Sequence, residues 1–137
     1  MISTAIKNEK GKFVALACTG DMTLAELTAA LRDIQLVLAE SGWNRILVDV
    51  TAVQAGPDTA ELFDFAKLFW RNYPQSGRIA LVVRWDQSTL SKVLEGMLRS
   101  VGVYLTVFVS EAMAKVWLVE RDFRACTRST SDSLLND

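Results

Sequence analysis

Two aspartates, Asp49 and Asp58, are the main candidates for a chemical role in this sequence. Asp49 lies near the end of a predicted strand at 45–50, and carboxylates at the carboxyl ends of strands can be functional in open α/β sheets. A phosphoryl-accepting aspartate would fit this position, but it also needs an acidic pair after the first strand and a lysine near the last, which together hold a divalent cation. Asp21 stands alone, and no lysine occupies a late strand end. The sequence therefore favours a plain strand-end or helix-capping role for Asp49 and keeps it as a candidate ligand or interface residue.

The second position is the pair Asp58-Thr59, which opens a predicted helix. Asp58 fits the N-cap, with Glu61 three residues later to complete a capping box. A helix N-terminus favours anions through its free amides and its dipole, so a phosphate added to Thr59 would be stabilised there. The simpler interpretation is that Asp58 caps the helix and Thr59 is a first-turn residue. The sequence favours that interpretation and keeps Asp58 and Thr59 as a candidate phospho-acceptor site.

The helix predicted at 58–73 carries an excess of aromatic residues. Its sheet-facing side should consist of residues at helical spacing, Leu62, Phe65, Ala66, Phe69 and Tyr73. Phe63 and Trp70 lie seven residues apart on the flank of that side. They either form part of a partner or dimer surface or pack under a neighbouring helix, and the sequence favours packing.

Trp85 and Asp86 directly follow a predicted strand at 78–84, at the position where ligands of α/β sheets usually bind. Tryptophan is enriched in interfaces and ligand sites. A tryptophan at a strand end could equally cover the core. Both interpretations of Trp85 stay open, and Asp86 joins it as a candidate ligand or interface residue.

The composition excludes the commonest kinds of catalysis. No histidine is present, which removes Ser-His-Asp and Cys-His arrangements and histidine-ligated metal sites. No GxGxxG, GxxxxGK[ST] or GxSxG motif occurs, and Cys18 and Cys126 fit no zinc spacing. We therefore expect no catalytic residues, no metal and no cofactor, and we expect Cys18 to be a small buried hydrophobe.

Charge and hydropathy limit the partners and the compartment. Fifteen Lys and Arg against sixteen Asp and Glu give a net charge of −1, which argues against binding to nucleic-acid phosphates. No apolar run approaches the ~18 residues of a membrane span, and residues 1–12 lack the apolar region of a signal peptide. We therefore expect a cytoplasmic protein.

Turn and capping signals divide the 137 residues into alternating elements. Asn8–Gly11 indicates a hairpin turn. Thr23–Glu26 is typical of a capping box, and Gly42 predicts the end of a helix. Ser88 and Ser110 are further candidate caps. The predicted strands are 2–7, 12–18, 45–50, 78–84 and 103–109, with helices from Thr23 to Gly42, over 58–73, from Ser88, and from Ser110 to about 121.

This order predicts an α/β fold. A mixed four- to five-stranded sheet with right-handed crossovers would follow an N-terminal β-hairpin, with four helices packed against it. We expect one domain at 1–124 and a polar, disordered tail at 125–137.

Several weak motifs follow one another along the chain: Gly20–Thr23, Arg45–Thr51, Arg78–Val83, Val107–Ala112 and Trp117-Leu118. Their order resembles the STAS family, which has the fold of the anti-sigma-factor antagonists. The resemblance covers about residues 2–120, and its later part looks like the SpoIIAA-like (STAS/SEC14-like) branch. In the phosphorylatable antagonists a Ser or Thr follows an Asp at the start of the second helix. Asp58–Leu62 is the nearest match here, with Glu61 where that motif has Gly.

The resemblance implies a non-enzymatic regulatory module that binds another protein or a second copy of itself, through the start of the second helix and its aromatic flank. The alternative is a small-molecule or lipid-binding STAS/SEC14-like module, with Trp85 and apolar faces lining a pocket. A third hypothesis, an enzyme that uses Asp49 and Asp58, is disfavoured by the missing histidine and motifs.

Overall fold

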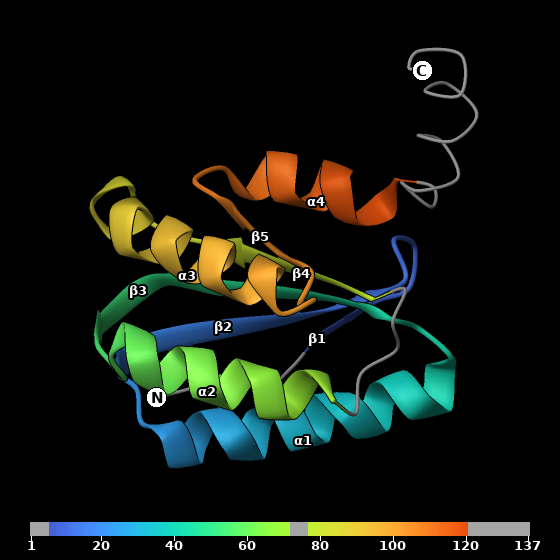
Figure 1. Ribbon diagram of the computed structural model, residues 1–137. Helices are drawn as coiled ribbons and strands as arrows, with labels where there is room; N and C mark the ends of the chain where they lie inside the picture. The colour runs from blue at the N-terminus through green and yellow to red at the C-terminus, as the bar shows by residue number, and fades with distance from the viewer. Residues whose placement is uncertain (1–5, 72–76, 121–137) are drawn as a thin grey trace.

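The computed structural model describes residues 6–71 and 77–120, except for the side chain of Trp70. The predicted tail at 125–137, Cys126, Tyr73 and most of the strand expected at 2–7 lie outside these residues. The elements, drawn in Figure 1, are β1 (Ile6–Asn8), β2 (Phe13–Asp21), α1 (Leu24–Ser41), β3 (Arg45–Ala55), α2 (Thr59–Trp70), β4 (Arg78–Val82), the 3-10 turn η1 (Trp85–Gln87), α3 (Ser88–Ser100), β5 (Leu105–Phe108) and α4 (Glu111–Val119).

The strands form one mixed sheet, as predicted. Its five strands lie in the order β1-β2-β3-β4-β5, with β1 antiparallel to β2 and the other pairs parallel. Every strand therefore lies beside the strand that precedes it along the chain. Each parallel pair is joined through one helix, as parallel crossovers require.

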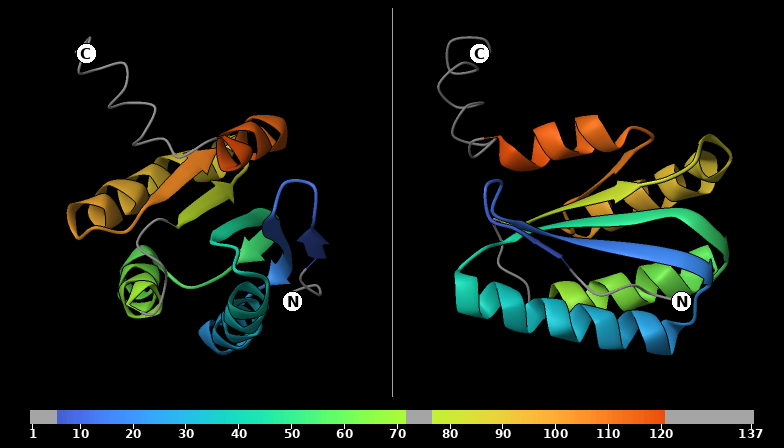
Figure 2. Two further views of the ribbon diagram at one scale, coloured as in Figure 1. Left: turned by 90° about the vertical axis from the view of Figure 1, so that its right-hand side faces the viewer. Right: turned by 180° about the vertical axis from the view of Figure 1, so that it is seen from behind.

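Helices cover both faces of the sheet. One core cluster joins α1, α2 and α3 to one face, through residues such as Leu31, Leu98 and Ile46. A smaller cluster joins α4 to the other face, where Ala114 and Leu118 pack against residues of β2, β3 and β4. Figure 2 shows α4 on the side of the sheet opposite α1 and α2. Because both faces are covered, β4 in the interior of the sheet is buried along almost its whole length, with only Leu81 half-buried.

The local signals at the start and end of α1 and at the start of α2 are confirmed. Thr23 and Asp58 each form a complete capping box, with Glu26 and Glu61 respectively. Gly42 ends α1 in the left-handed conformation, at φ 75°, and its amide donates to the carbonyl of Leu38. That conformation favours glycine because a Cβ would be strained there.

The hairpin and the last helix also begin as predicted. In the turn between β1 and β2, the Asn8 Oδ1 accepts from the Gly11 amide at 2.8 Å. The Ser110 hydroxyl accepts from the Met113 amide at 3.3 Å, which makes Ser110 the N-cap of α4.

The proposed cap at Ser88 is wrong. The hydroxyl of Ser88 donates to the carbonyl of Trp85 at 2.7 Å instead of accepting from a helix amide. The cause is η1, which leads directly into α3. Ser88 therefore already has helical backbone, with φ −67° and ψ −35°, whereas the side chain of an N-cap needs an extended backbone to reach the amides of the first turn.

The predicted strand at 45–50 is too short, which changes the position of Asp49. β3 continues to Ala55 and pairs along its length with β2, so Asp49 lies in the middle of the strand and not at its end. The pairing shifts register between Ala17 and Thr19, where β3 carries an extra residue. A bulge of this kind leaves backbone groups without ladder partners, and side chains from elsewhere in the chain satisfy them here.

Candidate functional site

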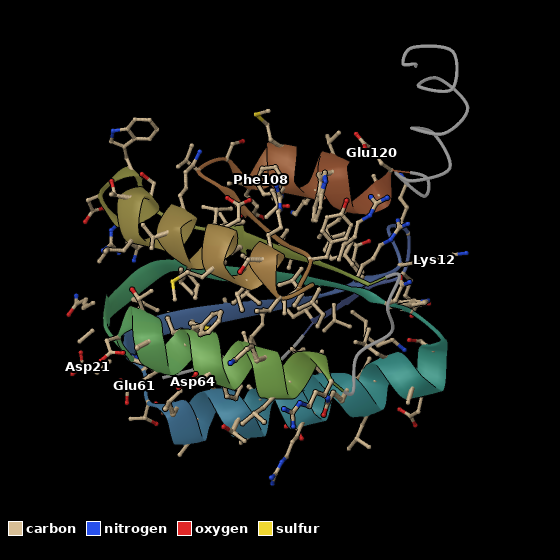
Figure 3. The ribbon with its side chains drawn as sticks, viewed as in Figure 1. Lys12, Asp21, Glu61, Asp64, Phe108 and Glu120 are labelled. Carbon is tan, nitrogen blue, oxygen red and sulfur yellow. The ribbon has the colours of Figure 1, made fainter. Side chains whose placement is uncertain are left out.

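The carboxyl ends of β3 and β4 meet the start of α2 and the turn η1 at one end of the molecule, on the left in Figure 1. We call the four residues Asp58, Thr59, Trp85 and Asp86 the carboxyl edge. All four were candidate residues from the sequence, and the topology brings them to the same end of the sheet. In Figure 3 the carboxylates of Asp21, Glu61 and Asp64 also lie at this end.

Asp58 and Glu61 bind each other's backbone. Asp58 Oδ1 accepts from the Glu61 amide at 2.8 Å, and Glu61 Oε1 accepts from the Asp58 amide at 3.0 Å. These bonds satisfy donors that the first turn of α2 would otherwise leave open. Both carboxylates are therefore held in structural bonds, and the half-buried Thr59 lies between them in the first turn.

Two residues that the sequence analysis did not single out hold the carboxyl edge together. Arg84 Nη1 donates to the carbonyls of Thr51 and, at 3.0 Å, Val53. Gln87 Nε2 donates to the carbonyl of Val50 at 3.0 Å, and its Oε1 accepts from the Arg84 amide at 2.7 Å. The carbonyls of the bulged part of β3 thus find donors from the segment that follows β4, as buried backbone groups must.

Trp85 lies on the outside of this arrangement. Its side chain is 80% exposed and does not line the cavity described below, so the expectation that Trp85 would line a pocket is wrong. In a 3-10 turn, residues three apart lie on the same side, which turns Arg84 and Gln87 inward and leaves Trp85 outward. Asp86 does line the cavity mouth, and its hydrogen bond from Arg84 Nε, at 3.0 Å, lowers its pKa.

A cavity of about 480 Å³ lies between α2 and the sheet. Four of the sheet-facing residues predicted for this helix, Leu62, Phe65, Ala66 and Phe69, line it on one side, and β3 and β4 line it on the other. Its exposed and polar lining residues belong to the carboxyl edge and its neighbours, so its mouth is there. The apolar walls include Val48, Leu62, Phe65, Ala66, Phe69, Leu81, Leu94 and Leu98, and the polar mouth includes Gln54, Asp58, Thr59, Arg84, Asp86, Gln87 and Ser91.

The packing of α2 explains the cavity. No α2 side chain that the structure describes is fully buried, whereas α1 buries Leu27, Leu31, Ile34 and Leu38. Because the cavity opens at the carboxyl edge, water or a small molecule can enter it from there.

The remaining candidate residues lie away from the carboxyl edge. Asp49 points to the sheet face that α4 covers, because strand residues alternate and Val48 and Val50 face the cavity. Its Oδ1 accepts from the amide and the hydroxyl of Thr51, at 2.9 and 2.6 Å. Phe63 is half-buried against the core, with Lys67 Nζ 4.6 Å from its ring centroid. Trp70 ends α2, and its side chain lies outside the described residues.

Two further features limit the chemistry of the site. Cys18 is 1% exposed, and burial raises the pKa of its thiol to about 11, so it is the buried hydrophobe that the sequence predicts. Within residues 6–71 and 77–120, no group of three or more His, Cys, Asp or Glu residues could hold a metal ion.

No helix in the same part of the chain is long and apolar enough to cross a membrane.

Comparison with known proteins shows the fold. No protein-family model matches the sequence, and no curated protein matches it. Among solved structures, the chain is similar to an anti-sigma factor antagonist from Mycobacterium paratuberculosis, with a TM-score of 0.63 and 13% identity over 88% of this chain and 96% of the other. It is also similar to an uncharacterised DUF3478-family protein with a SpoIIAA-like fold from Shewanella loihica. The TM-score is 0.59 and the identity is 15%, over 85% of this chain and 93% of the other. The chain therefore has the SpoIIAA-like fold that the sequence predicts.

Proposed function

We propose that this protein is a non-enzymatic regulatory module that binds another protein through its carboxyl edge. The observation that carries the proposal is the shared fold. It spans nearly the whole length of both this chain and a protein described as an anti-sigma factor antagonist. Such a protein is named for its effect on another protein, which is the class of role proposed here.

The surface at the carboxyl edge has the features of a binding site. Trp85 presents a large, 80% exposed ring beside the carboxylate of Asp86, and tryptophan is typical of the residues that dominate binding energy. Arg84 and Gln87 hold the backbone under this surface, so little conformational entropy is lost when a partner binds. An exposed tryptophan with carboxylates around it fits a partner pocket that is rimmed by Lys or Arg.

The bonds of the same carboxylates support a role without catalysis. Asp58 and Glu61 accept from helix amides, and Asp86 accepts from Arg84. A general acid or base needs a carboxylate that is free to reach a substrate proton. In each of these three carboxylates at least one oxygen is already held in a structural hydrogen bond.

Thr59 stays a candidate for phosphorylation within this proposal. A phosphate on Thr59 would be stabilised by the backbone amides of the first turn of α2. It would also lie beside Asp58 and Glu61, whose charges oppose a further negative group. We therefore expect the carboxyl edge to bind its partner when Thr59 is unmodified.

Native mass spectrometry of the protein purified from its own host tests the proposal. We expect a stoichiometric complex with another protein or with a second copy of this chain, and no phosphate mass on the bound form. Trp85→Ala should abolish the complex. Met113→Ala is the matched control, because Met113 is 65% exposed on α4 at the other face of the sheet, and it should keep the complex. A monomer alone, a complex that survives Trp85→Ala, or a complex that is lost in Met113→Ala would each contradict the proposal.

A further inference from the structure

We propose that the cavity between α2 and the sheet is a binding site for a neutral, mainly apolar small molecule that enters at the carboxyl edge. This inference goes beyond the proposed protein-binding role and does not depend on it. It rests on the walls of the cavity, its charges, its volume and the loose packing of α2.

The deep walls of the cavity are apolar on three sides. α2 contributes Leu62, Phe65 and Phe69, and α3 contributes Leu94 on the adjoining side. The floor is the sheet, with side chains such as Leu81. An apolar body buried there would lose contact with water on all three sides, which is the main source of affinity in pockets of this kind.

The charged side chains of the lining lie at the mouth and are already engaged. Arg84 donates to two carbonyls of β3 and to Asp86, and Asp58 accepts from the Glu61 amide. An anionic ligand would therefore meet two carboxylates and a guanidinium that is already bonded. Anionic head groups such as carboxylate or phosphate are disfavoured on this ground.

Two hydroxyl groups at the mouth are free to bind a neutral polar group. Thr59 and Ser91 both line the cavity, and neither side chain makes a hydrogen bond within the described structure. A hydroxyl can donate to and accept from another hydroxyl or an amide. The mouth therefore fits a ligand with one uncharged polar end and an apolar body.

The volume sets the size of that ligand. About 480 Å³ has room for roughly sixteen non-hydrogen atoms, at ~30 Å³ for each water-sized group. A ten-carbon alcohol fits within this limit and reproduces the chemistry of the mouth. Because no described α2 side chain is fully buried, such a ligand would also supply the packing that α2 lacks.

Calorimetry with 1-decanol, compared with decanoate, tests the inference. The wild-type protein should bind one molecule of 1-decanol and should bind decanoate at least about tenfold more weakly. Ala66→Phe places a ring in the cavity and should weaken 1-decanol binding by about tenfold or more. Ala60→Phe is the matched control, since Ala60 is exposed on the same helix outside the cavity, and it should leave binding unchanged.

Circular dichroism establishes that each variant is folded. If Ala66→Phe fails to fold, Leu81→Phe blocks the same space from the sheet side.

The inference is overturned if the wild-type protein binds no 1-decanol, which would mean that α2 closes onto the sheet or that water fills the space. It is also overturned if the folded blocking variant binds as tightly as the wild type. If the wild-type protein binds decanoate as tightly as 1-decanol, the claim that the polar end of the ligand is uncharged is refuted. The variant Trp85→Ala should leave 1-decanol binding intact, which separates this test from that of the protein-binding role.

Discussion

Replacement of Arg78 by methionine should destabilise the protein because this arginine anchors α4 to the sheet. Arg78 is 3% exposed at the start of β4. Its Nη1 donates to the carbonyl of Trp117 at 2.6 Å and to that of Glu120 at 3.4 Å, and its guanidinium carbon lies 5.5 Å from the centroid of the Trp117 ring. Arg45, its register partner in β3, donates to the carbonyl of Leu118 at 2.5 Å. Two arginines of the sheet thus satisfy the last turn of a helix that has no basic residue there.

The size of the effect follows from these contacts. Hydrogen bonds from a charged donor contribute about 1.5–3 kcal/mol each, and the long second bond of Arg78 lies at the weak end. The charge at the helix terminus and above the ring adds about 1–2 kcal/mol. Methionine recovers part of this sum, because it removes the cost of keeping a charge away from water. We expect a net loss of about 2–3 kcal/mol in the free energy of unfolding for Arg78→Met.

Urea denaturation followed by circular dichroism measures this loss. A change of about 2–3 kcal/mol should lower the urea midpoint by about 1–2 M. Lys115→Met is the control, since the exposed pair of Lys115 and Glu111 on the same helix should contribute only about 0.3–0.5 kcal/mol. If Arg78→Met costs no more than Lys115→Met, the anchoring of α4 by Arg78 is refuted.

Three further changes have definite expected outcomes. Because burial raises the pKa of the Cys18 thiol to about 11, the unfolded chain loses this proton first, and stability should fall by about 2 kcal/mol as the pH rises from 9 to 11. Urea midpoints across that range should show the fall, and Cys18→Ala should flatten it. Gly42→Ala should cost about 1 kcal/mol by thermal denaturation, because φ at this position is 75° while the space around it is open. A larger loss would point to a clash rather than to backbone strain. Asp58→Ala should cost about 1 kcal/mol through the lost N-cap of α2, and Asp58→Asn should restore most of it; equal losses would refute the capping role.

The parts of the fold that the sequence predicts are those with local causes. The capping box at Thr23, the helix end at Gly42 and the N-cap at Asp58 each depend on residues within four positions of one another, so the pattern is complete in the sequence. The apolar side of α2 was likewise predictable, because helical spacing alone places Leu62 and Phe65 on one side. What spacing could not show is that this side would face a cavity.

The parts that were missed depend on contacts between distant segments. The length of β3 depends on its pairing with β2 and on carbonyls that Arg84 and Gln87 satisfy from more than thirty residues away. The outward position of Trp85 depends on a 3-10 turn three residues long, for which the sequence has no separate signal. Arg78 was predicted only as the start of a strand, and its role at the end of α4 needs the folded sheet.

The order of the strands has a consequence for how the chain folds during synthesis. Each strand lies beside the one made just before it, so the sheet can grow one strand at a time as the chain leaves the ribosome, with α1, α2 and α3 covering one face on the way. The opposite face, with Phe13 and Leu47, is covered by α4, which is made after every described strand. A nascent chain that has completed β5 but not α4 would therefore expose a continuous apolar sheet face. That interval is when this protein would be most prone to aggregate and most in need of a chaperone.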